Sequence, residues 1–132
     1  VNQCLHQDGL FLLHTIGCNQ TKMATDPWIH KYIFPNGYIP SNQLITKNAE
    51  ALLQLEDWHN FGPSYDLTLM AWYKNFSQHW KQFQTQYPEN FFRMWKYYLL
   101  CCAGYFRSRK GQLWQMVFRH INSKKPYQCY RP

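Results

Sequence analysis

Two runs of aromatic residues with helical spacing dominate the second half of the sequence. In each run large apolar side chains recur every three or four positions, which is the period of one helix face. The two stripes are Leu69, Tyr73, Phe76, Trp80, Phe83 and Tyr87, followed by Phe91, Trp95, Tyr98, Cys102 and Tyr105. Pro88 separates them and breaks helical structure. We therefore expect two long helices that pack as an antiparallel hairpin over about residues 65–110.

The residues before the hairpin carry alternating strand and helix signals. Leu10–Leu13 is an apolar run between Gly9 and Gly17, and its length suits a strand that is buried on both faces at the centre of a sheet. Asp26 and Ser41 are helix N-cap residues in good positions to begin two short helices. A second strand is expected from residue 53 to 61. Strand, helix and strand in this order predict an α/β fold with a parallel sheet.

The sequence after the hairpin predicts one more strand and then a basic tail. Gly111 is expected to cap the second long helix, and residues 112–120 alternate as a third strand would. Residues 1–120 are thus interpreted as one unit. Residues 121–132 form a basic tail that we expect to be poorly ordered, and we assign it no role.

The strand positions indicate where chemistry would occur. In a parallel sheet, ligands bind beyond the carboxyl ends of the strands. His14 reaches that position on the first strand, with Ile16 at the rim, and Tyr65 falls just past the second strand. A core histidine held by one backbone hydrogen bond is an equally good interpretation of His14. Aromatic residues off the two helical seams, Trp72 and Phe106 among them, could line an apolar channel.

The charge distribution narrows the range of partners. All seven acidic residues lie at or before Glu89, whereas nine of the fourteen Lys and Arg residues lie from Arg93 onward. The last third is therefore a positive surface suited to the phosphates of lipid or nucleic acid. The longest apolar runs are too short to span a bilayer, so membrane contact would be peripheral. The five cysteines are interpreted as free thiols in a reducing compartment, and the histidines show no metal-site spacing.

Several segments together resemble the C-terminal part of the cyclopropane-fatty-acyl-phospholipid synthases. The matching segments are Phe11–Gly17, Asp26–Ile29, Lys31–Gly37, Glu56–Gly62, Tyr65–Asp66, Thr68–Trp72 and Gln112–Gln115. Their order and spacing make the resemblance specific, and it extends to about His120. The phospholipid-modifying branch is a closer match than the mycolic-acid branch.

The resemblance implies the C-terminal part of a class I methyltransferase (Rossmann-like) sheet. The activity that it implies is methylene transfer from S-adenosylmethionine to the cis double bond of an unsaturated phospholipid, which forms a cyclopropane ring. It also implies a bound bicarbonate as the base, held by His14, the backbone of Ile16 and Tyr65. Cys102 matches a family cysteine near the site, and a small core thiol is the alternative interpretation. The implied location is cytoplasmic, at the inner face of the membrane.

The sequence departs from the family in what it lacks. It has no glycine-rich loop and no acidic ribose partner, so we expect the S-adenosylmethionine site to lie mostly upstream and the chain alone to be inactive. An incomplete sheet would expose an edge, which favours self-association, including a homodimer. Two other functions stay open: a membrane-lipid-binding module without catalysis, and a basic nucleic-acid-binding domain, which the helical seams make less favourable.

Overall fold

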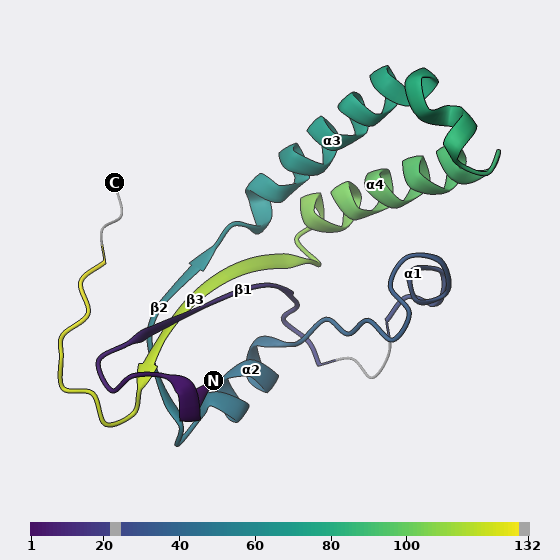
Figure 1. Cartoon of the computed structure of the whole chain (residues 1–132). Coiled ribbons are helices and arrows are strands. Elements are labelled where there is room, and N and C mark those ends of the chain that lie inside the picture. Colours follow the sequence, from purple (N-terminus) through teal and green to yellow (C-terminus); the bar gives the residue numbers. More distant parts are fainter. Residues whose placement is uncertain (22–24, 130–132) are drawn as a thin grey trace.

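The computed structural model describes residues 1–21 and 25–129 of the chain. The elements in order are η1 (Asn2–Cys4), β1 (Leu10–Gly17), α1 (Pro27–Tyr32), α2 (Asn42–Ala49), β2 (Leu53–Asn60), α3 (Gly62–Phe83), η2 (Gln84–Gln86), α4 (Phe91–Arg107) and β3 (Gln112–His120). A small sheet with α2 beside it forms one part, and the α3–α4 hairpin extends from one end of the sheet (Figure 1). The predicted α/β fold with a long antiparallel hairpin is confirmed.

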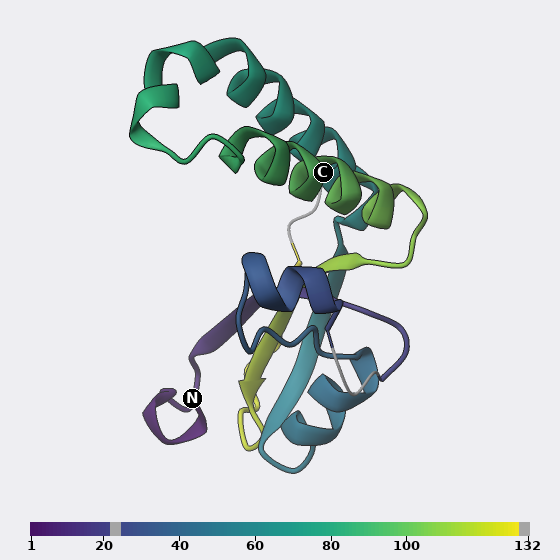
Figure 2. The ribbon, with the colours of Figure 1, turned by 90° about the vertical axis from the view of Figure 1, so that its right-hand side faces the viewer.

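The strand order is β1-β3-β2, and β3 is antiparallel to both neighbours. The prediction of a parallel sheet is therefore wrong for the described strands. The hairpin explains the difference, because it leaves the sheet after β2 and returns to the same end, so the next strand must run in the opposite direction (Figure 2). β1 and β2 still run in one direction, and their carboxyl ends both lie at the base of the hairpin.

The central strand is β3, not β1. On β1 the side chains of Leu10 and Leu12 are 51% and 53% exposed, whereas Phe11 and Leu13 are half-buried against the core. Within the part of the chain that the structure describes, β1 pairs on one side only. The prediction that β1 is buried on both faces is wrong here, because a run of apolar residues hides the alternation that marks a one-sided strand.

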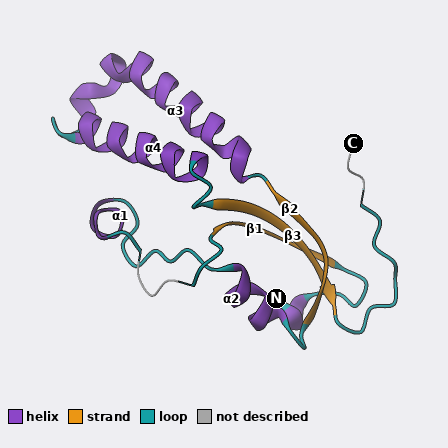
Figure 3. Ribbon diagram, turned by 180° about the vertical axis from the view of Figure 1, so that it is seen from behind, coloured by secondary structure: helices purple, strands orange, loops and turns teal. Residues whose placement is uncertain are grey.

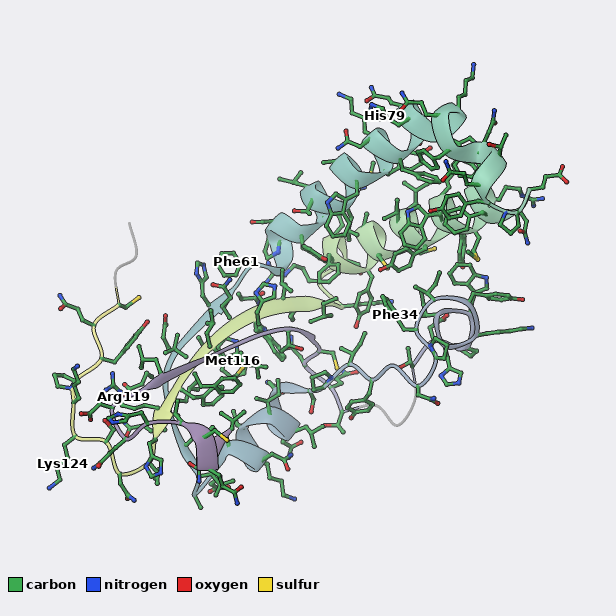
Figure 4. All side chains as sticks on the ribbon, viewed as in Figure 1. Phe34, Phe61, His79, Met116, Arg119 and Lys124 are labelled. Atoms are coloured by element: carbon green, nitrogen blue, oxygen red, sulfur yellow. The ribbon has the colours of Figure 1, made fainter. Side chains whose placement is uncertain are left out.

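One face of the sheet packs against α2. Trp114, Met116 and Phe118 of β3 are buried on this face, and Met116 is labelled in Figure 4. Ile45 and Ala49 of α2 pack against them. The opposite face carries the alternate residues of the three strands, which include Leu12, His14, Gln115, Val117 and His59 in matching register.

The hairpin has a core of its own that continues into the sheet. Leu69 of α3 packs with Leu99, Ala103 and Phe106 of α4, and Leu113 of β3 completes the cluster. The buried stripe of α4 thus differs from the expected one and consists of Leu99, Ala103 and Phe106. Tyr98 of the expected stripe instead faces Phe34, with 6.1 Å between the two ring centroids. α4 has two apolar stripes, and the aromatic one contacts the segment around α1. The placement of Phe106 off the seam is wrong, since it is only 2% exposed.

The two predicted helix N-caps are present in the structure, but the predicted glycine cap at Gly111 is not. The Asp26 carboxylate accepts from the backbone N–H groups of Trp28 and Ile29, both at 3.0 Å, and the Ser41 hydroxyl accepts from Leu44 at 3.1 Å. Gly111 is not the left-handed cap that was expected. The positive φ of 61° belongs to Arg109, and Gly111 is needed for space, because a Cβ there would lie 2.2 Å from the Tyr105 ring.

A hydrogen-bonded pair of side-chain amides, the buried Gln112 and the exposed Asn60, joins the hairpin to the sheet. Gln112, which is 2% exposed, accepts a hydrogen bond from the Asn60 side chain at 2.6 Å and donates to the Arg109 carbonyl at 2.7 Å. Asn60 in turn accepts from the backbone N–H of Gly62 at 2.9 Å. The start of α3 and the end of α4 are therefore tied to the same residue.

Residues 121–129, the described part of the tail after β3, form no helix or strand (Figure 3). Ser123 donates to the Asp8 carboxylate at 3.3 Å, and the Cys129 thiol lies 3.5 Å from the carboxylate of Asp57. Residues 130–132 of the tail lie outside the described residues, and its poor order stays a prediction. None of the described helices is long and apolar enough to cross a membrane.

Candidate functional site

His14 and Ile16 lie two residues apart on β1 and so share one face of the sheet. His14 is exposed and lies opposite Gln115, whereas Ile16 is half-buried against the core of the hairpin. Because His14 is exposed and lies outside both core clusters, it is not a core histidine in this structure.

The backbone of Ile16 faces the open edge of β1. Leu113, the partner of Ile16 in register, accepts a hydrogen bond from the Phe61 N–H on the β2 side at 2.7 Å. In an antiparallel ladder the N–H and C=O of one residue point to the same side, so Ile16 and Leu113 form a pair without mutual hydrogen bonds. The N–H of Ile16 therefore points away from β3, where it can donate to a ligand.

Tyr65 is in the first turn of α3, where its N–H donates to the Phe61 carbonyl at 3.2 Å. Its ring packs edge-on against Phe106 at 4.8 Å and against Trp72 at 5.9 Å. Burial raises the pKa of the Tyr65 hydroxyl, and the neighbouring Cys102 adds to the increase. At neutral pH the hydroxyl is protonated and can donate a hydrogen bond.

Cys102 lies on α4 beside the same cluster. Burial raises the pKa of the Cys102 thiol to about 11, and burial together with the nearby thiol raises the pKa of Tyr98 to about 12. The thiolate is the nucleophilic form of cysteine, so Cys102 is a protonated, weakly reactive group at neutral pH. A nucleophilic role for Cys102 is therefore not favoured.

The reactivity of Cys102 can be measured directly. At pH 7.5 we expect iodoacetamide to modify the exposed Cys101 much faster than Cys102, because a pKa of about 11 leaves little thiolate. The rate at Cys102 should rise with pH up to about 11. Peptide mass spectrometry of the Cys101→Ser and Cys102→Ser variants separates the two neighbours. Equal rates at pH 7.5 would contradict the assignment of a buried, protonated thiol.

The structure brings four of the predicted residues to one place. Ile16, Tyr65, Cys102 and Phe106 all belong to or pack against the core cluster at the base of the hairpin, and Trp72 contacts that cluster through Tyr65. His14 shares the sheet face of Ile16 but lies outside the cluster. The argument from strand ends assumed a parallel sheet, which is wrong for the described strands. It still led to this place, because β1 and β2 run in the same direction.

Two further tyrosines lie beside Cys102 at this site. Tyr98 and Tyr105 lie four residues before and three residues after Cys102 on α4, and burial raises the pKa of both hydroxyls. The helical spacing assigned them to a packing seam.

An ion pair borders the cluster. The Arg107 guanidinium donates two hydrogen bonds to the Asp66 carboxylate, at 2.9 and 3.0 Å, and this bonding lowers the pKa of Asp66. Within residues 1–21 and 25–129, no group of three or more His, Cys, Asp and Glu side chains could hold a metal ion. The cluster contains no charged side chain: its buried members are aliphatic apart from Phe106, and most of the partly buried side chains packed around them are aromatic.

Comparison with solved structures identifies the fold. The cyclopropane synthase MmaA2 from Mycobacterium tuberculosis superimposes with a TM-score of 0.79 at 23% identity, over 89% of this chain and 46% of that one. The mycolic acid cyclopropane synthase CmaA1, in a complex with SAH and CTAB, gives 0.76 at 23% identity, over 88% of this chain and 46% of that one. The fold is thus that of part of a methyltransferase of the cyclopropane synthase type.

The sequence comparison places the chain within a family. The model of the mycolic acid cyclopropane synthetase family matches residues 1–116, and the chain belongs to this family. It is 53% identical over 118 residues to the cyclopropane-fatty-acyl-phospholipid synthase of Escherichia coli K12. That match covers 89% of this chain and 31% of the relative, so the chain spans about a third of the relative's length. The resemblance seen in the sequence is confirmed.

Proposed function

We propose that this chain is the C-terminal part of an enzyme that transfers a methylene group from S-adenosylmethionine to the cis double bond of an unsaturated phospholipid. The observation that carries the proposal is the arrangement at the base of the hairpin. An uncharged aromatic cluster lies beside the Tyr65 hydroxyl, and the free N–H of Ile16 and the side chain of His14 share one sheet face. The 53% identity to a phospholipid synthase supports the choice of lipid.

The same residues fit a small anion such as bicarbonate. The Ile16 N–H points away from β3, the Tyr65 hydroxyl is a protonated donor, and the His14 side chain is exposed on the sheet face that it shares with Ile16. When bound, bicarbonate would supply the base that accepts the proton released as the ring closes. Tyr65, Ile16 and His14 would hold it in place. The chain would contribute little to binding of S-adenosylmethionine, for which its residues offer no glycine-rich loop.

The aromatic cluster suits the rest of the reaction. Positive charge that develops on the alkene must be protected from water, and aromatic faces stabilise cations. The exposed ring of Trp72 would line the acyl channel at this point, with the buried Phe106 packed against Tyr65 behind it and Cys102 as a supporting side chain. The substrate implies peripheral contact with the cytoplasmic face of a membrane, and the open edge of β1 supports a homodimer.

A hybrid enzyme tests this function. We expect a protein in which this chain replaces the matching segment of the Escherichia coli relative to form cyclopropane phospholipid within about tenfold of the relative's rate. The chain alone should form none. Gas chromatography of the fatty acid esters measures the product. A folded hybrid that binds S-adenosylmethionine but leaves the double bond unchanged would contradict the proposal.

A further inference from the structure

The basic residues of the hairpin helices are not evenly distributed. On α3, Lys74 and Lys81 are seven residues apart and share one side of the helix. On α4, Arg93 and Lys96 are three residues apart, and Arg107 follows Lys96 by eleven, so these three also share a side. All five side chains are exposed. They are the complete set of Lys and Arg residues in the two helices.

Two contacts between the helices show that both sides belong to one face of the hairpin. Arg107 reaches across to Asp66, and the Lys96 ammonium lies 6.0 Å from the centre of the Tyr73 ring. Lys74 follows Asp66 by eight residues, and Lys81 follows Tyr73 by eight, which is slightly more than two turns. The five cations therefore lie on the same face, which we call the basic face and define by Lys74, Lys81, Arg93, Lys96 and Arg107.

The basic face carries a net positive charge. Its one acidic residue is Asp66, whose carboxylate is already bound by Arg107 through two hydrogen bonds. The opposite face of the two helices has no charged side chain; it presents Thr68, Trp72 and Asn75 of α3 and Tyr98, Cys102 and Tyr105 of α4. Part of that uncharged side contacts the α1 segment, where Trp28 meets Tyr97 at 4.6 Å and Phe34 meets Tyr98.

We propose that the basic face binds the surface of a bilayer that contains anionic phospholipid. This inference rests on the proposed function, because it identifies the surface through which the chain would contact its lipid substrate. Each Lys or Arg near an anionic membrane contributes about 1 kcal/mol of attraction. The hairpin extends away from the sheet, so a flat surface can approach it (Figure 2).

The apolar residues of this face favour a bilayer over nucleic acid. Leu67 is 71% exposed and precedes Lys74 and Lys81 at seven-residue spacing, so an apolar side chain lies in line with the cations. Such a mixture suits the interface of headgroups and acyl chains. Single-stranded nucleic acid needs exposed aromatic rings for base stacking. On this face Tyr73 is half-buried beneath Lys96, and the exposed Trp72 points from the other side of α3.

Binding to vesicles tests the proposal with matched charge variants of this chain. One variant carries Lys74→Glu, Lys81→Glu and Arg93→Glu on the basic face; the control carries Lys47→Glu, Lys124→Glu and Lys125→Glu. Each variant changes the formal net charge by −6, from +7 to +1. Binding is measured by sedimentation with vesicles of phosphatidylglycerol and phosphatidylcholine, and with phosphatidylcholine alone. Circular dichroism verifies that both variants keep their helices.

We expect the basic-face variant to bind the anionic vesicles on the order of 100-fold more weakly than the unchanged chain, with a clearly smaller loss for the control. Equal losses in both variants would overturn the proposal, since only net charge would then matter. Absence of vesicle binding, or tighter binding to a single-stranded oligonucleotide at the same salt concentration, would also overturn it. No methyl donor is present, so failure of the hybrid enzyme with intact vesicle binding would refute the proposed function alone.

Discussion

Replacing Tyr65 by phenylalanine in the hybrid enzyme is expected to slow cyclopropane formation by roughly 100- to 1000-fold, the usual cost of losing one donor to an anion at a reaction centre. The substitution removes a hydroxyl group and keeps the ring that contacts Phe106 and Trp72. The fold should therefore be retained, and the loss should appear in kcat. The rate is measured with saturating S-adenosylmethionine and dispersed unsaturated phospholipid.

Tyr105→Phe is the matched control. Tyr105 also packs against Phe106, at 5.7 Å, and burial also raises the pKa of its hydroxyl, but no role in holding the anion is assigned to it. We expect its rate to stay within a few-fold of the unchanged hybrid. If both variants lost the same activity, the effect of Tyr65 would be one of packing, and the proposed bicarbonate contact would be wrong.

Gly17→Ala is expected to destabilise the fold by about 3 kcal/mol, at the upper end of the cost of overpacking a core. A Cβ at Gly17 would lie 2.1 Å from an atom of the Trp114 ring, and both residues are buried. Trp114 also packs edge-on against Trp58 at 5.0 Å, so its ring has little space to move. Urea unfolding followed by circular dichroism gives the change in the free energy of unfolding.

Gly104→Ala provides the control for this substitution. A Cβ at Gly104 would meet no atom within 4 Å, and the residue lies inside α4. Alanine there should stabilise the chain by about 0.5 to 1 kcal/mol through higher helix propensity. The two Gly→Ala changes should thus have opposite signs. A neutral or stabilising effect of Gly17→Ala would show that Trp114 is not packed as described.

The elements were predictable from the sequence because their signals are local. The N-caps at Asp26 and Ser41 and the break at Pro88 depend on chemistry within a few residues. The direction of the sheet was not predictable in this way. It depends on the hairpin returning the chain to the end of the sheet that it left, and no residue of β3 encodes that geometry.

The argument that located the candidate site was right about the shared direction of β1 and β2 but wrong about the parallel sheet. His14, Ile16 and Tyr65 were placed at strand ends, and the resemblance to the family assigned them a role that stays a proposal. The sequence could not show whether the N–H of Ile16 points toward β3 or away from it, because this direction is inferred from the hydrogen bond between Phe61 and Leu113. The buried position of Phe106 was also hidden, since α4 has apolar residues on more than one side.

The position of β3 has a consequence for synthesis of the chain. β3 is the last of the described strands, yet it takes part in both ladders of the described sheet, and its pairing of Leu10 with Arg119 joins residues 109 positions apart. On the ribosome, β1 and β2 therefore emerge before the strand that pairs them. Until His120 leaves the exit tunnel, the edges by which β1 and β2 pair with β3 stay unpaired. The α3–α4 hairpin is built from local contacts and can fold before β3 emerges.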